Sequence, residues 1–86
     1  MSRQITIYCW FPGSEQIIIE NFGRNYINVD VKKNIDTSLI YHRFLHDKYV
    51  ISGEDEEINR VINWIENSDL EIDILENGKL KIKESE

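Results

Sequence analysis

Several kinds of residue are scarce in this sequence of 86 residues, and each shortage excludes a class of protein. Cys9 is the only cysteine, which excludes an internal disulfide and a zinc site built from several cysteines. The glycines stand singly, so the sequence contains no glycine-rich phosphate-binding loop. No apolar run approaches the roughly 18 residues needed to span a bilayer, and none near Met1 has the features of a signal peptide. We therefore expect no membrane contact and a cytoplasmic location, which would be the host cytoplasm for a viral protein.

Alanine is absent, whereas isoleucine, asparagine, lysine, aspartate and glutamate are abundant. This bias is typical of AT-rich genomes and suggests a phage or a low-GC bacterium as the source. Fifteen isoleucines and nine aromatic residues supply the apolar bulk of a folded core. Because the length is that of one domain, residues 1–86 are predicted to form a single one.

Negative charge is concentrated near the carboxyl terminus. The formal net charge is −6 at pH 7. Residues 1–53 carry six basic and five acidic side chains, whereas residues 54–86 carry four basic and eleven acidic ones. This distribution favours a partner with a basic surface.

Residues 54–66 are predicted to form an amphipathic helix. Its apolar residues recur at i, i+3, i+4 and i+7, which places them on one helical face: Ile58, Val61, Ile62 and Ile65. Ser52 is at the expected N-cap position, and the carboxylates of residues 54–57 would lie near the positive end of the helix dipole.

Two alternating segments after this helix predict a carboxyl-terminal β-hairpin. A two-residue Asn77-Gly78 loop would place Ile74 opposite Lys81, an apolar side chain opposite a polar one. A loop one residue longer would instead place Ile74 opposite Leu80. We therefore predict the longer loop, with Gly78 in the left-handed conformation of a G1 bulge.

In the amino-terminal half, alternation predicts strands at residues 5–11 and 26–31, and either one bent strand or a hairpin turning at 46–48 within residues 39–52. Residues 34–37 are predicted to be a loop. The segment 14–22 is ambiguous, since it could be a strand by propensity or a short helix.

The helix is favoured for residues 14–22. Ser14 would then be its N-cap, Ile18, Ile19 and Phe22 its apolar stripe, and Gly23 its C′ residue. The resulting order of elements is ferredoxin-like with an additional last strand. If the segment were a strand, the fold would be an antiparallel sheet backed by one helix. Either way we predict an α+β fold with a small, mostly antiparallel sheet.

Three groupings of reactive residues have simpler structural explanations than a catalytic or metal-binding role. His42 and His46 have the spacing of two metal ligands on a helix, but a strand would hold them roughly 13 Å apart. Cys9 alternates in phase with Ile5 and is therefore expected to be a small buried apolar residue. The carboxylates of residues 54–57 fan around a helical turn, unlike the alternating ligands of a calcium loop. We accordingly predict no catalytic residue, no metal, no cofactor and no enzymatic activity.

Tyr8 and Trp10 are expected on the face of the first strand opposite its apolar residues. This aromatic strand resembles the first strand of RNA-recognition motifs. The second signature of that family, a basic residue followed by alternating glycine and aromatic positions, has no match in residues 46–53, and the negative net charge opposes phosphate binding. We expect no direct contact with nucleic acid, and expect the two rings to be covered by a packed layer or by a protein.

The sequence therefore predicts a non-catalytic, acidic protein-binding module that contacts a protein with a basic surface. In its sharpest form it would be an inhibitor that mimics the charge of nucleic acid to block a nucleic-acid-binding protein. The predicted partner-binding carboxylates are those of Glu54, Asp55, Glu56, Glu57, Glu66 and Asp69. The alternative is a structural or assembly subunit that forms a homodimer through Tyr8 and Trp10.

Overall fold

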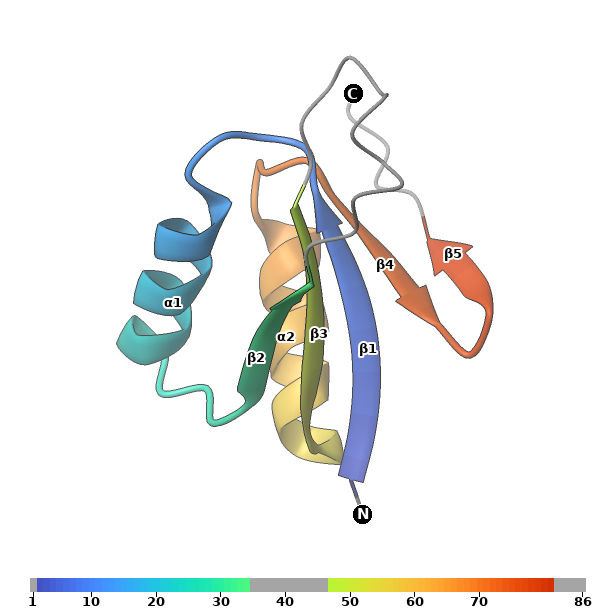
Figure 1. Ribbon diagram of the computed structural model, residues 1–86. Helices are drawn as coiled ribbons and strands as arrows, with labels where there is room; N and C mark the ends of the chain where they lie inside the picture. Colours follow the sequence, from blue (N-terminus) through green and yellow to red (C-terminus); the bar gives the residue numbers. More distant parts are fainter. Residues whose placement is uncertain (1, 35–46, 82–86) are drawn as a thin grey trace.

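In the computed structural model, which describes residues 2–34 and 47–81, seven elements follow one another along the chain (Figure 1). They are β1 (Ser2–Cys9), α1 (Ser14–Arg24), β2 (Asp30–Asn34), β3 (Asp47–Glu54), α2 (Asp55–Asn67), β4 (Ile72–Glu76) and β5 (Lys79–Lys81). The predicted α+β fold is confirmed, with the ferredoxin-like order of elements, two helices and a carboxyl-terminal hairpin.

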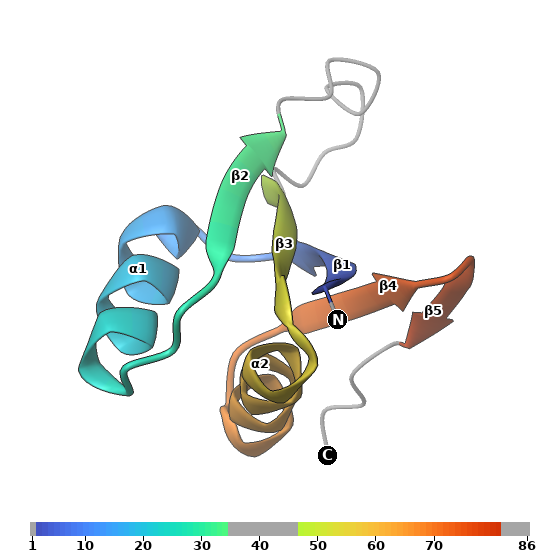
Figure 2. The same cartoon turned by 90° about the horizontal axis from the view of Figure 1, so that it is seen from below.

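The strands form one antiparallel sheet in the spatial order β2-β3-β1-β4-β5. Each helix joins two strands that are separated by a third: α1 connects β1 to β2 across β3, and α2 connects β3 to β4 across β1. Both helices lie on the same face of the sheet, as Figure 2 shows. We call the other side the open sheet face, because neither helix lies on it.

The core lies between the two helices and one face of the sheet. Its buried apolar residues are Ile5, Ile7, Cys9, Ile18, Phe22, Tyr49, Ile51, Ile58, Val61, Ile65, Ile72 and Ile74. The apolar stripe predicted for the second helix is thus confirmed, although its fourth member, Ile62, is only half-buried. Cys9 is buried, as the alternation of β1 predicts.

Helix α1 forms where it was favoured, but the prediction of its N-cap was wrong. Gly13, with φ of 71°, occupies the N-cap position and makes no side-chain cap bond. Ser14 is the first helical residue, and its buried hydroxyl contacts Asp47 and Tyr49 of β3. A tertiary contact has therefore replaced the local cap that the sequence suggests.

The other end of α1 also differs from the prediction. Gly23 lies inside the helix, and Asn25 is the C-cap. Ile18 and Phe22 face the core as predicted, but Ile19 is 56% exposed. Ile18 and Phe22 are four residues apart and therefore lie on the same face of the helix. Ile19 is rotated about 100° around the helix axis from Ile18, which turns it away from the core.

The predicted cap of the second helix was wrong as well. Ser52 lies within β3, paired in register with Gln4 and Asp30. Glu54 is the N-cap residue, and its side chain makes no capping hydrogen bond to the helix. Because β3 pairs with a strand on each side, it continues up to the start of α2. Ser52 therefore has the backbone conformation of a strand and does not cap the helix.

The predicted register of the hairpin was also wrong. β4 and β5 are joined by the two-residue loop of Asn77 and Gly78, and Ile74 lies opposite Lys81. Both loop residues have positive φ, 52° and 76°, as a type I′ turn requires, and this turn matches the twist of the strands. The side chain of Lys81 reaches Glu66 of α2 at 3.2 Å, which accommodates a polar residue opposite Ile74. The left-handed conformation predicted for Gly78 is confirmed.

Other boundaries shifted by a few residues. β1 ends two residues before the predicted end of the first strand, and β2 begins later than residue 26. Residues 47 and 48 lie within β3, so the chain does not turn at these two positions. The predicted loop after residue 34, and both His42 and His46, lie outside the described residues. Among the helices that the structure describes, none has the length and apolar character to cross a membrane.

Candidate functional site

A buried polar cluster holds the start of α1 against β3. The Ser14 hydroxyl donates to Oδ2 of Asp47 at 2.6 Å and lies 2.7 Å from the hydroxyl of Tyr49. The amino group of Lys33 approaches Oδ1 of Asp47 at 3.8 Å. Cys9 lies in the same part of the core.

The residue types of this cluster are those of nucleophilic enzymes, but its geometry is that of a structural contact. Ser14 and Cys9 have no exposed surface. Burial, with the nearby charge of Asp47, raises the pKa of the Cys9 thiol to about 12. Burial likewise raises the pKa of Tyr49 to about 12. A catalytic nucleophile needs access and a lowered pKa, so this cluster supports no catalytic role.

A second polar cluster ties the first strand to the hairpin and to α2. The guanidinium of Arg3 makes two hydrogen bonds to Glu76, at 2.6 and 2.7 Å, and a third to Oδ1 of Asn59 at 2.7 Å. Its Nη1 also lies 3.6 Å from Asp55. The hydrogen bonds with Arg3 lower the pKa of Glu76. Shallow hollows flank this pair on both sides, but the guanidinium is already surrounded by carboxylates, which leaves no site for an anion.

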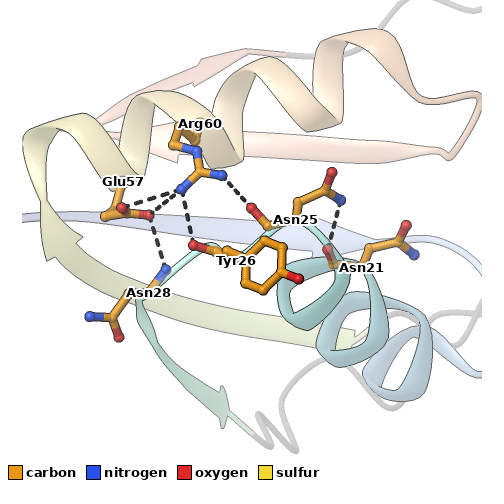
Figure 3. A network of polar contacts seen from close by, with 6 residues as sticks. All are labelled: Asn21, Asn25, Tyr26, Asn28, Glu57 and Arg60. Atoms are coloured by element: carbon orange, nitrogen blue, oxygen red, sulfur yellow. Dashed lines mark hydrogen bonds and ion pairs between the residues drawn. The ribbon is translucent and has the colours of Figure 1, made fainter.

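A third network fixes the connection between α1 and β2 (Figure 3). Arg60 of α2 donates to the main-chain oxygen of Tyr26 at 3.0 Å and to that of Asn25. It also pairs with Glu57 at 3.2 Å, and Glu57 in turn accepts the backbone N–H of Asn28 at 3.0 Å. One ion pair of α2 therefore holds the end of α1 and the turn that follows it.

Tyr26, which this network holds, was predicted to begin a strand. It instead has φ of 55°, and its side chain is 86% exposed. A bulky residue with positive φ is uncommon and costs free energy. The position follows the C-cap of α1, where main-chain hydrogen bonds close the helix end: the N–H of Tyr26 donates to Gly23 at 3.2 Å, and that of Ile27 to Phe22 at 2.8 Å. The main-chain oxygen of Tyr26 also accepts from Arg60, which is 34 residues away along the chain.

The predicted acidic residues form two groups instead of one surface. Glu54 to Glu57 lie at the amino-terminal end of α2, whereas Glu66 and Asp69 lie at and beyond its carboxyl-terminal end. The rise of the helix separates Glu57 from Glu66 by about 14 Å. The exposed asparagines Asn59, Asn63 and Asn67 follow one another at i, i+4 and i+8 along the outer side between these groups.

Three of the predicted carboxylates form ion pairs with basic residues of the described chain. Asp55 pairs with Arg3, Glu57 with Arg60 and Glu66 with Lys81, at 3.6, 3.2 and 3.2 Å. The side chains of Glu54, Glu56 and Asp69 are exposed.

The structure adds one carboxylate that was not predicted. Asp30 is exposed and pairs in register with Ser52, which places it diagonal to Glu54 on the same face of the sheet. We call Asp30 and Glu54 to Glu57 together the acidic end of the molecule. Sequence reasoning missed Asp30 because only the register of β2 against β3 brings it to this end.

The predicted aromatic residues lie on the open sheet face. Lys48 and Asp73 are the register neighbours of Tyr8 on either side. The amino group of Lys48 lies 5.8 Å from the centre of the Tyr8 ring, within range of a cation–π contact. Trp10 donates its indole N–H to Asp73 at 2.9 Å and is 40% exposed.

The described residues contain no group of three or more histidine, cysteine, aspartate or glutamate side chains that could hold a metal ion. The chain matches no protein-family model, no curated protein and no solved structure. The function therefore has to be argued from the surfaces of this chain.

Proposed function

We propose that the protein is a non-catalytic protein-binding module whose acidic end contacts a basic surface of another protein. The observation that carries this proposal is the convergence of carboxylates from separate segments at one end of the molecule. Asp30 comes from the start of β2, Glu54 from the end of β3, and three more from the first turn of α2. Arg3 and Arg60 each pair with one of these carboxylates, so the end stays net negative.

Such a surface attracts a basic partner over distances set by ionic screening. Glu54 and Glu56 are exposed and place negative charge on the protein surface. This charge increases the rate of association with a basic partner and makes binding sensitive to salt. Charge of this kind contributes more to association rate and specificity than to affinity.

Tyr26 supplies the apolar contact that charge alone lacks. Its side chain is exposed, its main-chain oxygen accepts a hydrogen bond from Arg60, as Figure 3 shows, and tyrosine is enriched among residues that dominate binding energy. Residues in uncommon backbone conformations cluster at functional sites, and Tyr26 has positive φ where main-chain hydrogen bonds end α1. These two features support a recognition role for the acidic end.

The sharper form of the proposal is an inhibitor that occupies the nucleic-acid-binding face of its partner, with carboxylates in place of phosphates. This form makes a distinct prediction: the protein should displace labelled DNA from the partner in competition. A partner that binds the protein and DNA at the same time would limit the proposal to a binding module.

A pair of matched double variants tests the proposed surface. Glu54→Gln with Glu56→Gln removes two charges from the acidic end, whereas Glu20→Gln with Glu71→Gln removes two exposed charges elsewhere. We expect the control to retain the proteins that wild type retains from a bacterial lysate at about 50 mM salt, and the acidic-end variant to lose them. Wild type should also lose them at about 500 mM salt, where the Debye length is only a few Å. Equal retention by both variants would contradict the proposed site.

The alternative function, an assembly subunit acting through the aromatic rings, is favoured by a separate observation. Trp10 and Leu80 are 40% and 52% exposed, large side chains that a monomer leaves in contact with water.

A further inference from the structure

Strand β2 forms one edge of the sheet. Among the strands that the structure describes, it pairs with β3 alone, so every second residue of β2 directs its backbone N–H and C=O groups away from β3. Such groups can pair with the edge strand of another chain. Figure 1 and Figure 2 both show α1 on the same side of the molecule as this edge. A chain that binds the edge would therefore meet side chains of β2 and of α1.

Two charged side chains of β2 lie on the open sheet face without an opposite charge beside them. Asp30 is diagonal to Glu54, and Lys32 is diagonal to Lys48, whereas the residues of β3 directly opposite both are uncharged. Asp30 and Lys32 are exposed, and neither forms an ion pair or side-chain hydrogen bond with the residues that the structure describes. A second chain could supply the opposite charge to each.

Apolar side chains lie beside the same edge on the other face of the sheet. Val31 is half-buried and lies opposite the core residue Ile51, so its side chain is on the side of the sheet that carries α1. The ion pair of Lys33 with Glu15, at 3.6 Å, identifies the side of α1 that faces β2. Ile19 is four residues after Glu15 and therefore lies on that side, and it is 56% exposed.

Ile19 and Val31 lie at the same height along the edge. α1 runs antiparallel to β2, because it connects β1 to β2 and both of these strands are antiparallel to β3 (Figure 1). Starting from the pair of Glu15 and Lys33, the four helical residues to Ile19 span about 6 Å, and the two strand residues back to Val31 span about 6.6 Å. An exposed apolar side chain of α1 therefore lies beside the middle of the segment 30–32.

We propose that β2 pairs antiparallel with β2 of a second copy of this chain, about a two-fold axis that passes through Val31 perpendicular to the sheet. Asp30 of each copy then lies opposite Lys32 of the other. The two sheets become one continuous sheet with all four helices on the same side. Ile19 of each copy lies close to the axis, where α1 of the second copy covers it.

The charges of β2 select this register. In an antiparallel pair, opposite residues share a face of the sheet, so the axis can pass through Asp30, Val31 or Lys32. An axis at Asp30 brings aspartate against aspartate, and an axis at Lys32 brings lysine against lysine and Val31 against Lys33. Of the three, the axis at Val31 alone gives two opposite-charge contacts. Lysine on an edge strand ordinarily discourages pairing, but in this register Asp30 of the second copy compensates it.

Charge reversal tests the interface and its register. In Asp30→Lys, both charge contacts become lysine against lysine, and in Lys32→Asp they become aspartate against aspartate. We expect each variant to dissociate at least about tenfold more readily than wild type. The variant with both substitutions keeps the net charge of −6 and exchanges the two charges, so it should dimerise as wild type does. An equimolar mixture of the two single variants should also dimerise.

The measurement is molar mass by sedimentation equilibrium over the micromolar range, with circular dichroism as the check of folding. The matched controls are Asp69→Lys and Lys79→Asp, which make the same charge changes at exposed positions outside β2. Ile19→Glu provides an independent test. It replaces an exposed side chain of α1, so the variant should fold, and it should be monomeric.

Three results would overturn the proposal. A monomeric wild type at the highest concentration would exclude a second copy and leave the edge to a strand of another protein. A wild-type dimer that persists in both charge reversals and in Ile19→Glu would place the interface elsewhere. A folded double variant that stays monomeric would exclude this register. Because the purified protein alone is measured, these results are independent of the function proposed for the acidic end.

Discussion

Replacement of Ser14 by aspartate distinguishes between two roles of this residue, helix capping and a buried contact with β3. As an N-cap, serine is interchangeable with aspartate, so a capping role predicts almost no change in stability. In the structure, however, the Ser14 hydroxyl is buried and lies 2.6 Å from a carboxylate oxygen of Asp47. A second carboxylate at this position would be held against the first one.

The expected cost follows from burial and distance. Two carboxylates in contact cannot both ionise, and an uncompensated buried charge costs roughly 3 to 5 kcal/mol. Ser14→Ala loses one hydrogen bond to a charged group, worth about 1.5 to 3 kcal/mol, and regains about 0.5 kcal/mol of helix propensity. We therefore expect Ser14→Asp to be the more destabilising of the two variants.

Thermal unfolding followed by circular dichroism measures the difference. In a domain of this size, each kcal/mol shifts Tm by about 4 to 8 °C, so Ser14→Asp should lower it by more than about 12 °C. The control is Gln16→Asp, which adds a carboxylate to the exposed side of the same helical turn and should change Tm little. The pKa of the new carboxyl group would be raised in the folded state, so the variant should regain stability as pH falls. An unchanged Tm for Ser14→Asp would refute the buried contact and restore the capping role.

Three further predictions concern the turn, the thiol and one ion pair. Gly78→Ala should destabilise the fold by roughly 1 kcal/mol because φ is positive there, whereas Gly23→Ala, inside α1 with open space around it, should stabilise it by about 0.4 to 1 kcal/mol; chemical denaturation should show opposite signs. Cys9, whose pKa is raised to about 12 by burial, should react with a thiol reagent only after unfolding, and rapid reaction of the native protein would contradict its burial. Because Arg3 lowers the pKa of Glu76, the ionised carboxylate stabilises the fold above its unfolded pKa of about 4.3, and this contribution is lost as pH falls through the folded pKa. Glu76→Gln should therefore be less stable than wild type at pH 7 and approach it in acid, and a constant difference between the two would contradict the ion pair.

The parts of the fold that depend on periodicity could be predicted from the sequence. The stripe of α2 and the alternation of β1 fix which side chains are buried, because each requires only the geometry of one element. The choice of helix for α1 then determines the order of elements, and through it the placement of both helices on one face.

The parts that failed depend on contacts between elements. Ser14 and Ser52 are good caps by local rules, but the first is held by Asp47 and the second by strand pairing. The hairpin register was chosen by matching apolar residues, whereas Asn77 and Gly78 favour the tight turn and Lys81 finds a partner on α2. Contacts between side chains of different helices and strands cannot be deduced from the pattern of apolar and polar residues along the sequence.

The candidate site shows the same division. The number of charges locates the carboxylates at the start of α2. The contribution of Asp30 depends on the register of β2 against β3, and the position of Tyr26 beside α2 depends on the contacts that Arg60 and Glu57 make with the end of α1 and the turn after it. The sequence also could not reveal that Asp55 is paired with Arg3.

Zero-length cross-linking tests the central claim most directly, because a carbodiimide couples carboxylates to lysines only where they touch. The purified protein, incubated with bacterial lysate at low salt, should form conjugates whose cross-linked peptides join partner lysines to Glu54, Asp55 or Glu56. These conjugates should disappear at high salt, and the variant with Glu54→Gln and Glu56→Gln should form fewer of them than the control with Glu20→Gln and Glu71→Gln. Conjugates that join through carboxylates outside the acidic end, or that persist at high salt, would contradict a basic partner at the acidic end.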